Sequence, residues 1–444
     1  MNTMLHRNIG TNKSGHLTFA KVDTTALAKK YGTPLMLVDE EGIRQQCRLY
    51  IEATRKHFGP NSRVLYASKA FCFTALYKIL REEGLGADVI SLGEMHTAVT
   101  GGMPLSETVF HGNFKQDEEL HYAISNKIGR IVIDSLDDLE RIIANIPLWN
   151  EGVARSDGVV RQKVQLRIIP GVEPDTHSKI ITGNKDTKFG VPMRADIVKR
   201  IIDSPHLELT GFHYHIGSQI FETMPFIAAV SNLMNFVAHL KDTLGFETKE
   251  INIGGGAAVR YTESQPIVDY KEIIANVANV LKATTTQLPA VWLEPGRSII
   301  AQNCMTLYTV GAVKNNYIIV DGGMTDNPRY ALYGAPYTIY NAKNPTPSAP
   351  SAATPSHEGD YYTVAGRCCE SGDIIQENVN LPKTVAGDIL AVACTGAYNY
   401  SMASNYNRLP RPAVVMIDKN GKDRIVIRRE TVEDLLHLDI LPRP

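Results

Sequence analysis

The feature that most constrains the fold is a series of eight short, apolar, β-branched runs between residues 63 and 294. Segments with a helical spacing of apolar residues, such as 75–83 and 230–240, lie between these runs. The predicted strands are residues 63–67, 87–91, 108–111, 130–134, 163–169, 209–216, 250–253 and 290–294. Strands that alternate with helices form parallel βαβ units, so the chain is predicted to be an α/β protein with a TIM (β/α)8 barrel.

The pattern changes beyond the eighth run. Residues 306–320 and 361–427 contain short alternating strands without long helices, which predicts a second, mostly β domain with a barrel or sandwich architecture. Residues 344–356 are rich in Pro, Ser and Ala and predict a surface loop or a partly disordered insertion. The expected domains are a TIM barrel over 36–300 and a β domain formed by 1–35 together with 301–444.

The composition is that of an ordinary globular protein, because 43% of the residues are hydrophobic and 21% are charged. A net charge of -1 provides no overall field that would attract nucleic acid or an anionic membrane. No apolar run approaches the roughly 18–20 residues of a membrane span, and residues 1–7 lack the apolar stretch of a signal peptide. The six cysteines show no zinc or disulfide spacing, so we expect a reducing, cytoplasmic location and a small-molecule ligand.

Residues with chemical potential follow the predicted strands, and the carboxyl ends of the strands are where barrel enzymes build their active sites. Lys69 follows the first strand. A lysine amine at this position could form a Schiff base with an aldehyde, whereas the alternative is a solvated surface lysine. Its place at a strand end favours the functional interpretation.

Two loops at the end of the barrel resemble a phosphate site. Gly254-Gly255-Gly256 ends the seventh strand, and Glu294-Pro295-Gly296-Arg297 ends the eighth. Glycines expose backbone N–H groups and an arginine can bind phosphate oxygens, although the glycines alone could form a tight turn. Glu294 could keep the ring nitrogen of a pyridoxal cofactor protonated, or it could form a buried salt bridge with an arginine.

His213 and His215 are two residues apart on the sixth predicted strand, so their side chains are expected on one face. Such a pair could bind a metal, but only His111 and Asp134 offer further ligands at the other strand ends. A histidine that stacks on a flat cofactor ring fits the other residues better. His213 could also be an ordinary core histidine.

The β domain contributes three further clusters. Arg329 and Tyr333, four residues apart, could hold a substrate carboxylate. Cys369 offers a thiol proton donor beside the carboxylate of Glu370, and Tyr398 offers a phenol near glycine. Taken alone, each cluster could also be a turn with ordinary polar residues.

Together these residues resemble the diaminopimelate decarboxylases, which are pyridoxal-phosphate enzymes of the alanine-racemase-like fold type III group. The resemblance covers residues 6–439 and consists of seven ordered motifs. These are Tyr66-Ala67-Ser68-Lys69-Ala70, His215-Ile216-Gly217-Ser218-Gln219, Gly254-Gly255-Gly256, Glu294-Pro295-Gly296-Arg297, Arg329 with Ala331-Leu332-Tyr333, Cys369-Glu370-Ser371-Gly372-Asp373 and Gly396-Ala397-Tyr398.

The resemblance implies that Lys69 carries pyridoxal 5'-phosphate, that His215 stacks on its ring and that Glu294 pairs with its nitrogen. Further implied cofactor contacts are Asp88, Ser218, Gly255, Gly256, Pro295, Gly296, Arg297 and Tyr398, with Glu94 near Lys69. The implied substrate contacts are Arg297, Arg329, Tyr333, Glu370 and Tyr398. Cys369 is implied to donate a proton across the interface of a homodimer, so that the β domain completes the active site.

The function that the resemblance implies is the decarboxylation of meso-2,6-diaminopimelate to L-lysine and carbon dioxide, the last step of lysine biosynthesis. The chain departs from the family pattern at Ala258, where a fourth glycine is usual, and at Pro328 and Tyr330, which flank the substrate arginine. Three alternatives are a related decarboxylase for another amino acid or a carrier-bound substrate, a non-catalytic pyridoxal-phosphate carrier, and a metal-dependent barrel hydrolase that uses His213 and His215.

Overall fold

The computed structural model describes residues 4–149, 161–173, 187–348 and 361–440. The chain divides into two compact units. The barrel unit comprises residues 46–258 and 268–296, and the sheet unit comprises residues 1–45, 259–267 and 297–444. Among the described residues, no helix combines the length and the apolar composition that a membrane span requires.

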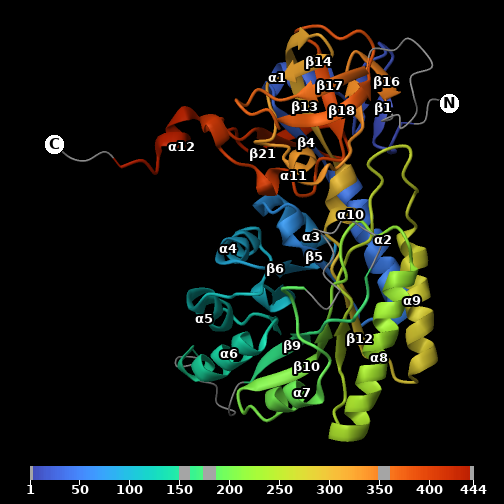
Figure 1. Ribbon diagram of the computed structural model, residues 1–444, viewed down its shortest axis with the longest axis vertical. Coiled ribbons are helices and arrows are strands. Elements are labelled where there is room, and N and C mark those ends of the chain that lie inside the picture. Colours follow the sequence, from blue (N-terminus) through green and yellow to red (C-terminus); the bar gives the residue numbers. More distant parts are fainter. Residues whose placement is uncertain (1–3, 150–160, 174–186, 349–360, 441–444) are drawn as a thin grey trace. The chain divides into compact units, whose positions relative to one another are not determined.

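The barrel unit is built on a closed barrel of eight parallel strands (Figure 1). The strands are β5 (Arg63–Ala67), β6 (Gly86–Val89), β7 (Thr108–Phe110), β8 (Arg130–Ile133), β9 (Gln162–Arg167), β10 (Leu207–His213), β11 (Glu250–Asn252) and β12 (Ala290–Leu293). The pairing of β12 with β5, with Leu293 opposite Val64, closes the barrel. Each predicted strand overlaps one of these eight, and the predicted TIM barrel is confirmed.

Helices connect the strands of the barrel, as the helical spacing of apolar residues predicts. They are α3 (Thr74–Glu82), α4 (Leu92–Thr100), α5 (Asp117–Ser125), α6 (Leu136–Trp149), α7 (Ala195–Ile202), α8 (Met224–Leu244) and α9 (Tyr270–Thr284), preceded by α2 (Glu40–Phe58). Asp269 caps α9 by accepting the backbone N–H groups of Lys271 and Glu272. Gly245, in the left-handed conformation with φ of 64°, ends α8.

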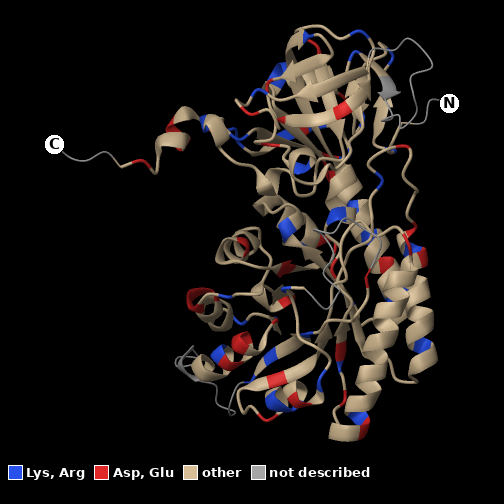
Figure 2. Ribbon diagram, viewed as in Figure 1, with Lys and Arg blue, Asp and Glu red and all other residues tan. Residues whose placement is uncertain are grey.

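Residues of both charges are spread over the elements of the chain (Figure 2), and one charged cluster lies at the amino ends of the barrel strands. Arg130, the first residue of β8, donates from Nε to Oε2 of Glu250, the first residue of β11, at 3.0 Å. The guanidinium of Arg130 also lies 5.3 Å from the ring centre of Trp292. Trp292 packs with the core residues Leu65, Val109 and Val132. This end of the barrel therefore stabilises the fold, because barrel active sites form at the opposite end.

The sheet unit contains a sheet of ten strands, which confirms the predicted mostly β domain (Figure 1). Seven strands follow the order β16-β15-β19-β13-β14-β17-β18, while β4 pairs with β13 and β20, and β20 pairs with β21. Their bounds are β4 (Leu35–Asp39), β13 (Cys304–Lys314), β14 (Tyr317–Val320), β15 (Ile339–Asn341), β16 (Asn344–Ser348), β17 (Tyr361–Ala365), β18 (Ile374–Asn380), β19 (Ile389–Ala393), β20 (Ala413–Ile417) and β21 (Asp423–Ile427).

The N-terminal residues belong to the sheet unit. They form a small antiparallel sheet of β1 (Ile9–Thr11), β2 (Leu17–Phe19) and β3 (Val22–Asp23), followed by α1 (Thr24–Tyr31). The N–H of Leu17 donates to the carbonyl oxygen of Ala342 at 2.7 Å, so these residues are held to the loop after β15. The last helix of the described residues is the short α12 (Val432–Leu436).

The prediction of a surface loop over residues 344–356 is wrong for its first part. Residues 344–348 form β16, which pairs antiparallel with β15. Strand β16 lies at the edge of the sheet, where Pro345 and Pro347 are tolerated because an edge strand needs fewer backbone donors. Residues 349–356 lie outside the described part of the chain.

Replacing Arg130 by Met tests the role of the charged cluster. The change removes the cation from a carboxylate that is 9% exposed, so we expect the free energy of unfolding to fall by about 3 kcal/mol. Urea denaturation followed by circular dichroism measures this loss. As a control, Lys199→Met breaks the exposed pair with Asp203 and should change stability little. Equal stability of Arg130→Met and the unmodified protein would contradict the proposed role.

Candidate active site

Lys69 lies at the carboxyl end of β5, in the short helix η1 (Ser68–Ala70), and its side chain is exposed. Asp88, at the end of the neighbouring strand β6, accepts the backbone N–H of Ser68 at 3.0 Å. Burial and the negative charge of Glu294 raise the pKa of Asp88 to about 6. Burial and the charge of Asp88 raise the pKa of Glu94, in the first turn of α4, to about 7. The lysine therefore stands beside two weakly acidic carboxyl groups.

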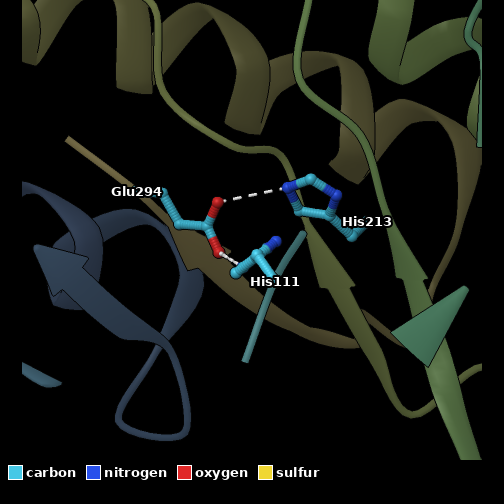
Figure 3. Close-up of side chains that lie close together, drawn as sticks. All are labelled: His111, His213 and Glu294. Carbon is cyan, nitrogen blue, oxygen red and sulfur yellow. Dashed lines mark hydrogen bonds and ion pairs between the residues drawn. The ribbon is translucent and has the colours of Figure 1, made fainter. Parts of the chain in front are cut away.

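Glu294 follows β12 and is buried in the same end of the barrel. It accepts hydrogen bonds from Nε2 of His111 at 2.8 Å and Nε2 of His213 at 3.1 Å (Figure 3). It also accepts a hydrogen bond from Nδ2 of Asn252 at 2.6 Å. Burial alone would raise the pKa of this carboxyl, but His111 and His213 hold it well below its usual range. Glu294 is therefore an anion, and its donors are two histidines and an asparagine instead of the arginine that the alternative interpretation expects.

The two predicted histidines have different partners. His213 is the last residue of β10, and burial lowers its pKa to about 3, so its ring is neutral and donates from Nε2 to Glu294. His215 lies beyond the strand, and its Nδ1 accepts the backbone N–H of Gly255 at 3.3 Å. Desolvation and the positive charge of Lys69 keep the pKa of His215 well below its ordinary value. His215 is thus a neutral ring that carries its proton on Nε2.

The glycine triplet forms a tight turn against the end of β12. Gly254 and Gly256 have φ of 66° and 120°, a region that side chains rarely adopt. A Cβ atom on Gly255 would lie 2.2 Å from the carbonyl oxygen of Glu294. The N–H of Glu294 donates to the carbonyl oxygen of Gly254 at 2.8 Å. The turn and the carboxylate are therefore parts of one rigid structure, and the half-buried Ser218 follows His215 on the preceding loop.

The residues after Glu294 lie against the strand that leads to Lys69. The carbonyl oxygen of Pro295 accepts the N–H of Ala67 at 3.2 Å. A Cβ atom on Gly296 would lie 2.7 Å from the Cβ atom of Ala67. This close approach requires glycine and brings the ends of β12 and β5 together.

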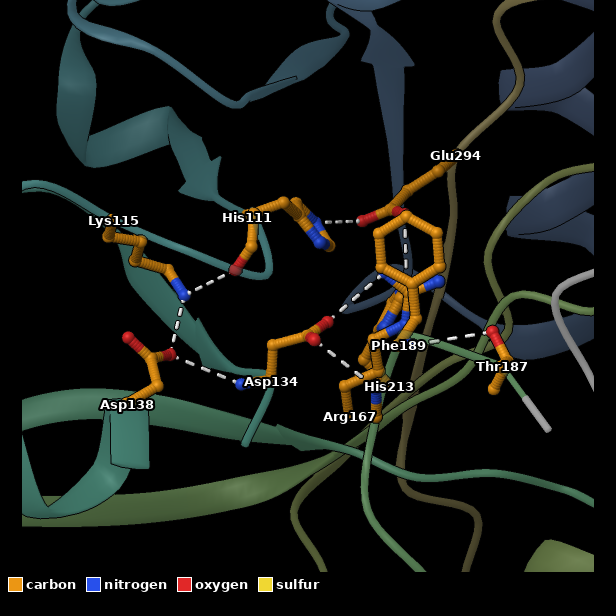
Figure 4. Close-up of polar contacts among 11 residues, drawn as sticks. His111, Lys115, Asp134, Asp138, Arg167, Thr187, Phe189, His213 and Glu294 are labelled. Atoms are coloured by element: carbon orange, nitrogen blue, oxygen red, sulfur yellow. Dashed lines mark hydrogen bonds and ion pairs between the residues drawn. The ribbon is translucent and has the colours of Figure 1, made fainter. Parts of the chain in front are cut away.

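A second layer of buried charges supports the cluster (Figure 4). Arg167 donates to Asp134 at 3.3 Å, and its guanidinium lies 4.5 Å from the ring centre of Phe189. Lys115, which is fully buried, donates to Asp138 at 2.7 Å. Because Asp138 also accepts the N–H of Asp134 at 3.2 Å, the two ion pairs are connected. Paired buried charges hold the loops after β7, β8 and β9 in defined positions.

Two predicted arginines share one tyrosine in the sheet unit. Arg297, which begins α10 (Arg297–Ile300), donates to the hydroxyl of Tyr261 at 2.8 Å and lies 4.7 Å from the ring centre of Tyr398. Arg329, which begins α11 (Arg329–Tyr333), lies 5.2 Å from the ring centre of Tyr261 and donates to the hydroxyl of Tyr337 at 3.1 Å. The structure thus brings Arg297, Arg329 and Tyr398 together.

Arg329 is only 6% exposed. After burial, the group that most affects its pKa is the phenol of Tyr337. Burial would lower the pKa of Arg329, but Tyr337 and Tyr261 raise it above its ordinary value. The guanidinium is therefore a buried cation in an aromatic environment. Such a cation is suited to bind an anionic ligand group. Tyr333, at the end of α11, is half-buried.

Cys369 and Glu370 lie on an exposed loop of the sheet unit. The N–H of Cys369 donates to Oδ1 of Asn407 at 2.8 Å, and Glu370 accepts the N–H of Gly372 at 3.1 Å. Asp373 fixes the base of this loop by accepting the N–H of Cys368 at 2.7 Å. Both predicted side chains are thus accessible.

The hydrogen bonds that four residues of the site make were not predicted from the sequence. These residues are His111, Asn252, Tyr261 and Tyr337. His111 and Asn252 end or follow barrel strands, as the predicted residues do, and this position was the available signal. Tyr261 and Tyr337 lie outside the motifs and had no signal.

The described residues fit pyridoxal phosphate. The cofactor has an aldehyde, a ring nitrogen and a phosphate, each of which needs its own partner. The barrel unit offers the exposed amine of Lys69, the anionic carboxylate of Glu294 and the backbone turn of Gly254-Gly255-Gly256. His111, His213 and Glu294 present ligand atoms within 4.8 Å of one another, but mutual hydrogen bonds account for this grouping, and His215 is not part of it.

Comparison with known proteins identifies the family. The family model for the pyridoxal-dependent decarboxylase, pyridoxal binding domain, matches residues 42–301. The chain is 40% identical to the diaminopimelate decarboxylase of Bacillus subtilis (strain 168) over 453 residues, covering 98% of each chain. It is 39% identical to that of Staphylococcus aureus (strain COL) over 441 residues, covering 96% of this chain and 98% of the other.

Solved structures of similar fold belong to the same family. The diaminopimelate decarboxylase of M. jannaschii in complex with L-lysine has a TM-score of 0.88 at 32% identity, with 99% of each chain covered. The enzyme of Helicobacter pylori with L-lysine has a TM-score of 0.81 at 29% identity, covering 93% of this chain and 98% of the other. The chain belongs to the diaminopimelate decarboxylase family of pyridoxal-dependent decarboxylases.

Proposed function

We propose that this protein is a pyridoxal-phosphate-dependent carboxy-lyase that converts meso-2,6-diaminopimelate to L-lysine and carbon dioxide, the last step of lysine biosynthesis. The observation that carries the proposal is the anionic Glu294 in the barrel end that also bears Lys69. The names of the similar proteins, and the L-lysine bound in two similar structures, support the choice of substrate and product.

In the proposed reaction, the bond between the D-configured carbon and its carboxylate breaks, carbon dioxide leaves, and a proton takes its place on that carbon. Bound pyridoxal phosphate supplies an aldehyde and a protonated ring that withdraws the electron pair of the broken bond. Lys69 would hold the aldehyde, and Glu294 would keep a proton on the ring nitrogen because its own pKa is low. The neutral ring of His215 can stack on the cofactor without adding a charge.

The proposed cofactor contacts extend those of Lys69, Glu294 and His215. They are Asp88, Ser218, Gly255, Gly256, Pro295, Gly296, Arg297 and Tyr398. We propose that the barrel, residues 36–300, binds the cofactor, and that residues 1–35 and 301–444 form the domain that supplies substrate contacts. A cytoplasmic location agrees with six free cysteines in the described residues.

For the substrate, we propose contacts with Arg297, Arg329, Tyr333, Glu370 and Tyr398. Diaminopimelate has a distal carboxylate that lysine and ornithine lack. Arg329, a buried cation surrounded by tyrosines, is suited to bind that carboxylate. Glu370, which is exposed, is assigned to the distal ammonium. We propose this recognition as the reason why diaminopimelate is preferred over other amino acids.

We also propose that the protein works as a homodimer in which Cys369, from the partner copy, donates the proton. The thiol is exposed in the single chain. Large apolar side chains are exposed just after three neighbouring barrel strands: Ile90 at 42%, Phe114 at 71% and Leu136 at 47%. Exposed apolar side chains at one rim of the barrel are typical of a protein–protein interface. We propose that a second copy of the chain covers them.

Replacing Lys69 by Ala should abolish both decarboxylation and the visible absorbance of a cofactor bonded to lysine. The reason is that Lys69 is the one lysine of the motif Tyr66-Ala67-Ser68-Lys69-Ala70. Absorbance spectroscopy measures the band. Borohydride reduction followed by peptide mass spectrometry should locate the cofactor on Lys69 in the unmodified protein. Lys78→Ala, an exposed lysine on α3, is the control. A persistent band in Lys69→Ala would overturn the assignment.

Replacing Arg329 by Met should lower kcat/KM for diaminopimelate by roughly 10- to 150-fold, since a charge-assisted hydrogen bond contributes about 1.5–3 kcal/mol. Release of carbon dioxide from diaminopimelate, lysine, ornithine and arginine should be assayed side by side. Any release of carbon dioxide from substrates without a distal carboxylate should not change. Arg200→Met, in an exposed pair with Glu140, is the control. Higher activity of the unmodified protein on ornithine, lysine or arginine would favour the related decarboxylase instead.

Mixing Lys69→Ala with Cys369→Ala tests the shared site. Each variant alone should be nearly inactive, whereas a mixed dimer should contain one site with both Lys69 and Cys369. Activity should therefore reappear after the two variants are unfolded together and refolded, or co-expressed. If both residues act within one chain, mixing will restore nothing, which would contradict the proposed dimer.

A further inference from the structure

We infer that Asn252 is a positioning residue: its side-chain amide fixes the anionic carboxylate of Glu294 and couples this carboxylate to the turn at Gly254. The inference rests on the proposed function, in which Glu294 serves the ring nitrogen of the cofactor. Asn252 is the last residue of β11 and is fully buried. Its side chain therefore has only the partners that the barrel offers.

The orientation of the amide is determined by its neighbours. Oδ1 of Asn252 accepts the backbone N–H of Gly254 at 3.0 Å. Since a backbone N–H can only donate, the oxygen of the amide must face Gly254 and the NH2 group must face Glu294. Nδ2 then donates to Oε1 of Glu294 at 2.6 Å. The side chain thus bridges the glycine turn and the carboxylate.

The three hydrogen-bond donors are divided unequally between the two carboxylate oxygens of Glu294. Oε1 accepts from Asn252 at 2.6 Å and from His111 at 2.8 Å, which occupies both of its lone pairs. Among the described residues, the donor to Oε2 is His213 alone, at 3.1 Å (Figure 3). This oxygen therefore retains a lone pair for a further N–H donor. A proton on Oε1 would displace one of its donors. Asn252 therefore favours the anion and leaves Oε2 available to a further donor, which in the proposed function would be the ring nitrogen.

An asparagine differs from its isostere aspartate at this position. In Asn252→Asp, a second carboxylate would lie at hydrogen-bonding distance from Oε1 of Glu294, and the two groups would share one proton. Among the described residues, the other charged or titratable groups that interact with Glu294 are Asp88, His111, Arg167, His213 and His215. None of these residues is replaced in the variant, so a new pH dependence of stability would arise from the added carboxyl group.

The fold should survive the substitution. The backbone bond from the N–H of Glu294 to the carbonyl oxygen of Gly254, at 2.8 Å, joins the same two segments without the side chain of Asn252. The pairing of β11 with β10 and β12 also uses backbone groups. Asn252→Ala, which adds no titratable group, is the matched control for Asn252→Asp.

The experiment compares thermal unfolding of the full-length unmodified protein, Asn252→Asp and Asn252→Ala, with and without pyridoxal phosphate. The shared proton has a pKa above its unfolded value, so its stabilisation is present at low pH and is lost as the pH rises. The deficit in Tm of Asn252→Asp should therefore grow by about 2–4 °C between about pH 5.5 and 8.5. The deficit of Asn252→Ala should stay constant. A constant deficit for Asn252→Asp would overturn the inference.

Kinetics of the cofactor-loaded protein supply the second readout. Misplacement of Glu294 in Asn252→Ala should lower kcat by roughly ten- to a hundredfold, while KM for diaminopimelate stays nearly unchanged. An unchanged kcat would overturn the positioning role. If the unmodified protein fails to decarboxylate diaminopimelate, the proposed function fails, but the pH dependence of unfolding still decides whether Asn252 and Glu294 are coupled.

Discussion

The central physical constraint on the barrel unit is the burial of one negative charge at the end of β12. A buried carboxylate is stable only when hydrogen bonds replace its hydration. Glu294 receives three such bonds, from residues at or after three other strands. Closure of the barrel brings these strand ends together, and the glycine turn is required because β11 and β12 approach so closely there. The fold and the charge of Glu294 therefore depend on each other.

The sheet unit has the opposite constraint, a buried positive charge. Arg329 is surrounded by tyrosine rings and hydroxyl groups, and Tyr261 contacts both Arg329 and Arg297. Aromatic rings solvate a guanidinium only partly, so an anionic ligand gains more from Arg329 than from an arginine already paired with a carboxylate. In the proposed function, Arg329 therefore supplies the local positive charge for the distal carboxylate of the substrate, which the net charge of -1 of the whole chain does not reveal.

The eight strands could be predicted because each is a short β-branched run separated from the next by a helical pattern, as for residues 63–67 and β5. Lys69 and Glu294 could be predicted because barrel enzymes place chemistry at strand ends. The roles of Asn252 and His111 could not, since their partner is 42 and 183 residues away and the contacts depend on strand register. Similarly, β16 was missed because its prolines are typical of loops, and only its edge position makes them acceptable.

The most direct test of the proposed reaction is its atom balance in heavy water. Purified protein supplied with pyridoxal phosphate and meso-diaminopimelate should release one carbon dioxide and one L-lysine for each substrate consumed. Mass spectrometry should find a single deuterium on carbon, at the position that lost the carboxylate. Carbon dioxide without lysine, or lysine without carbon-bound deuterium, would contradict the proposed reaction.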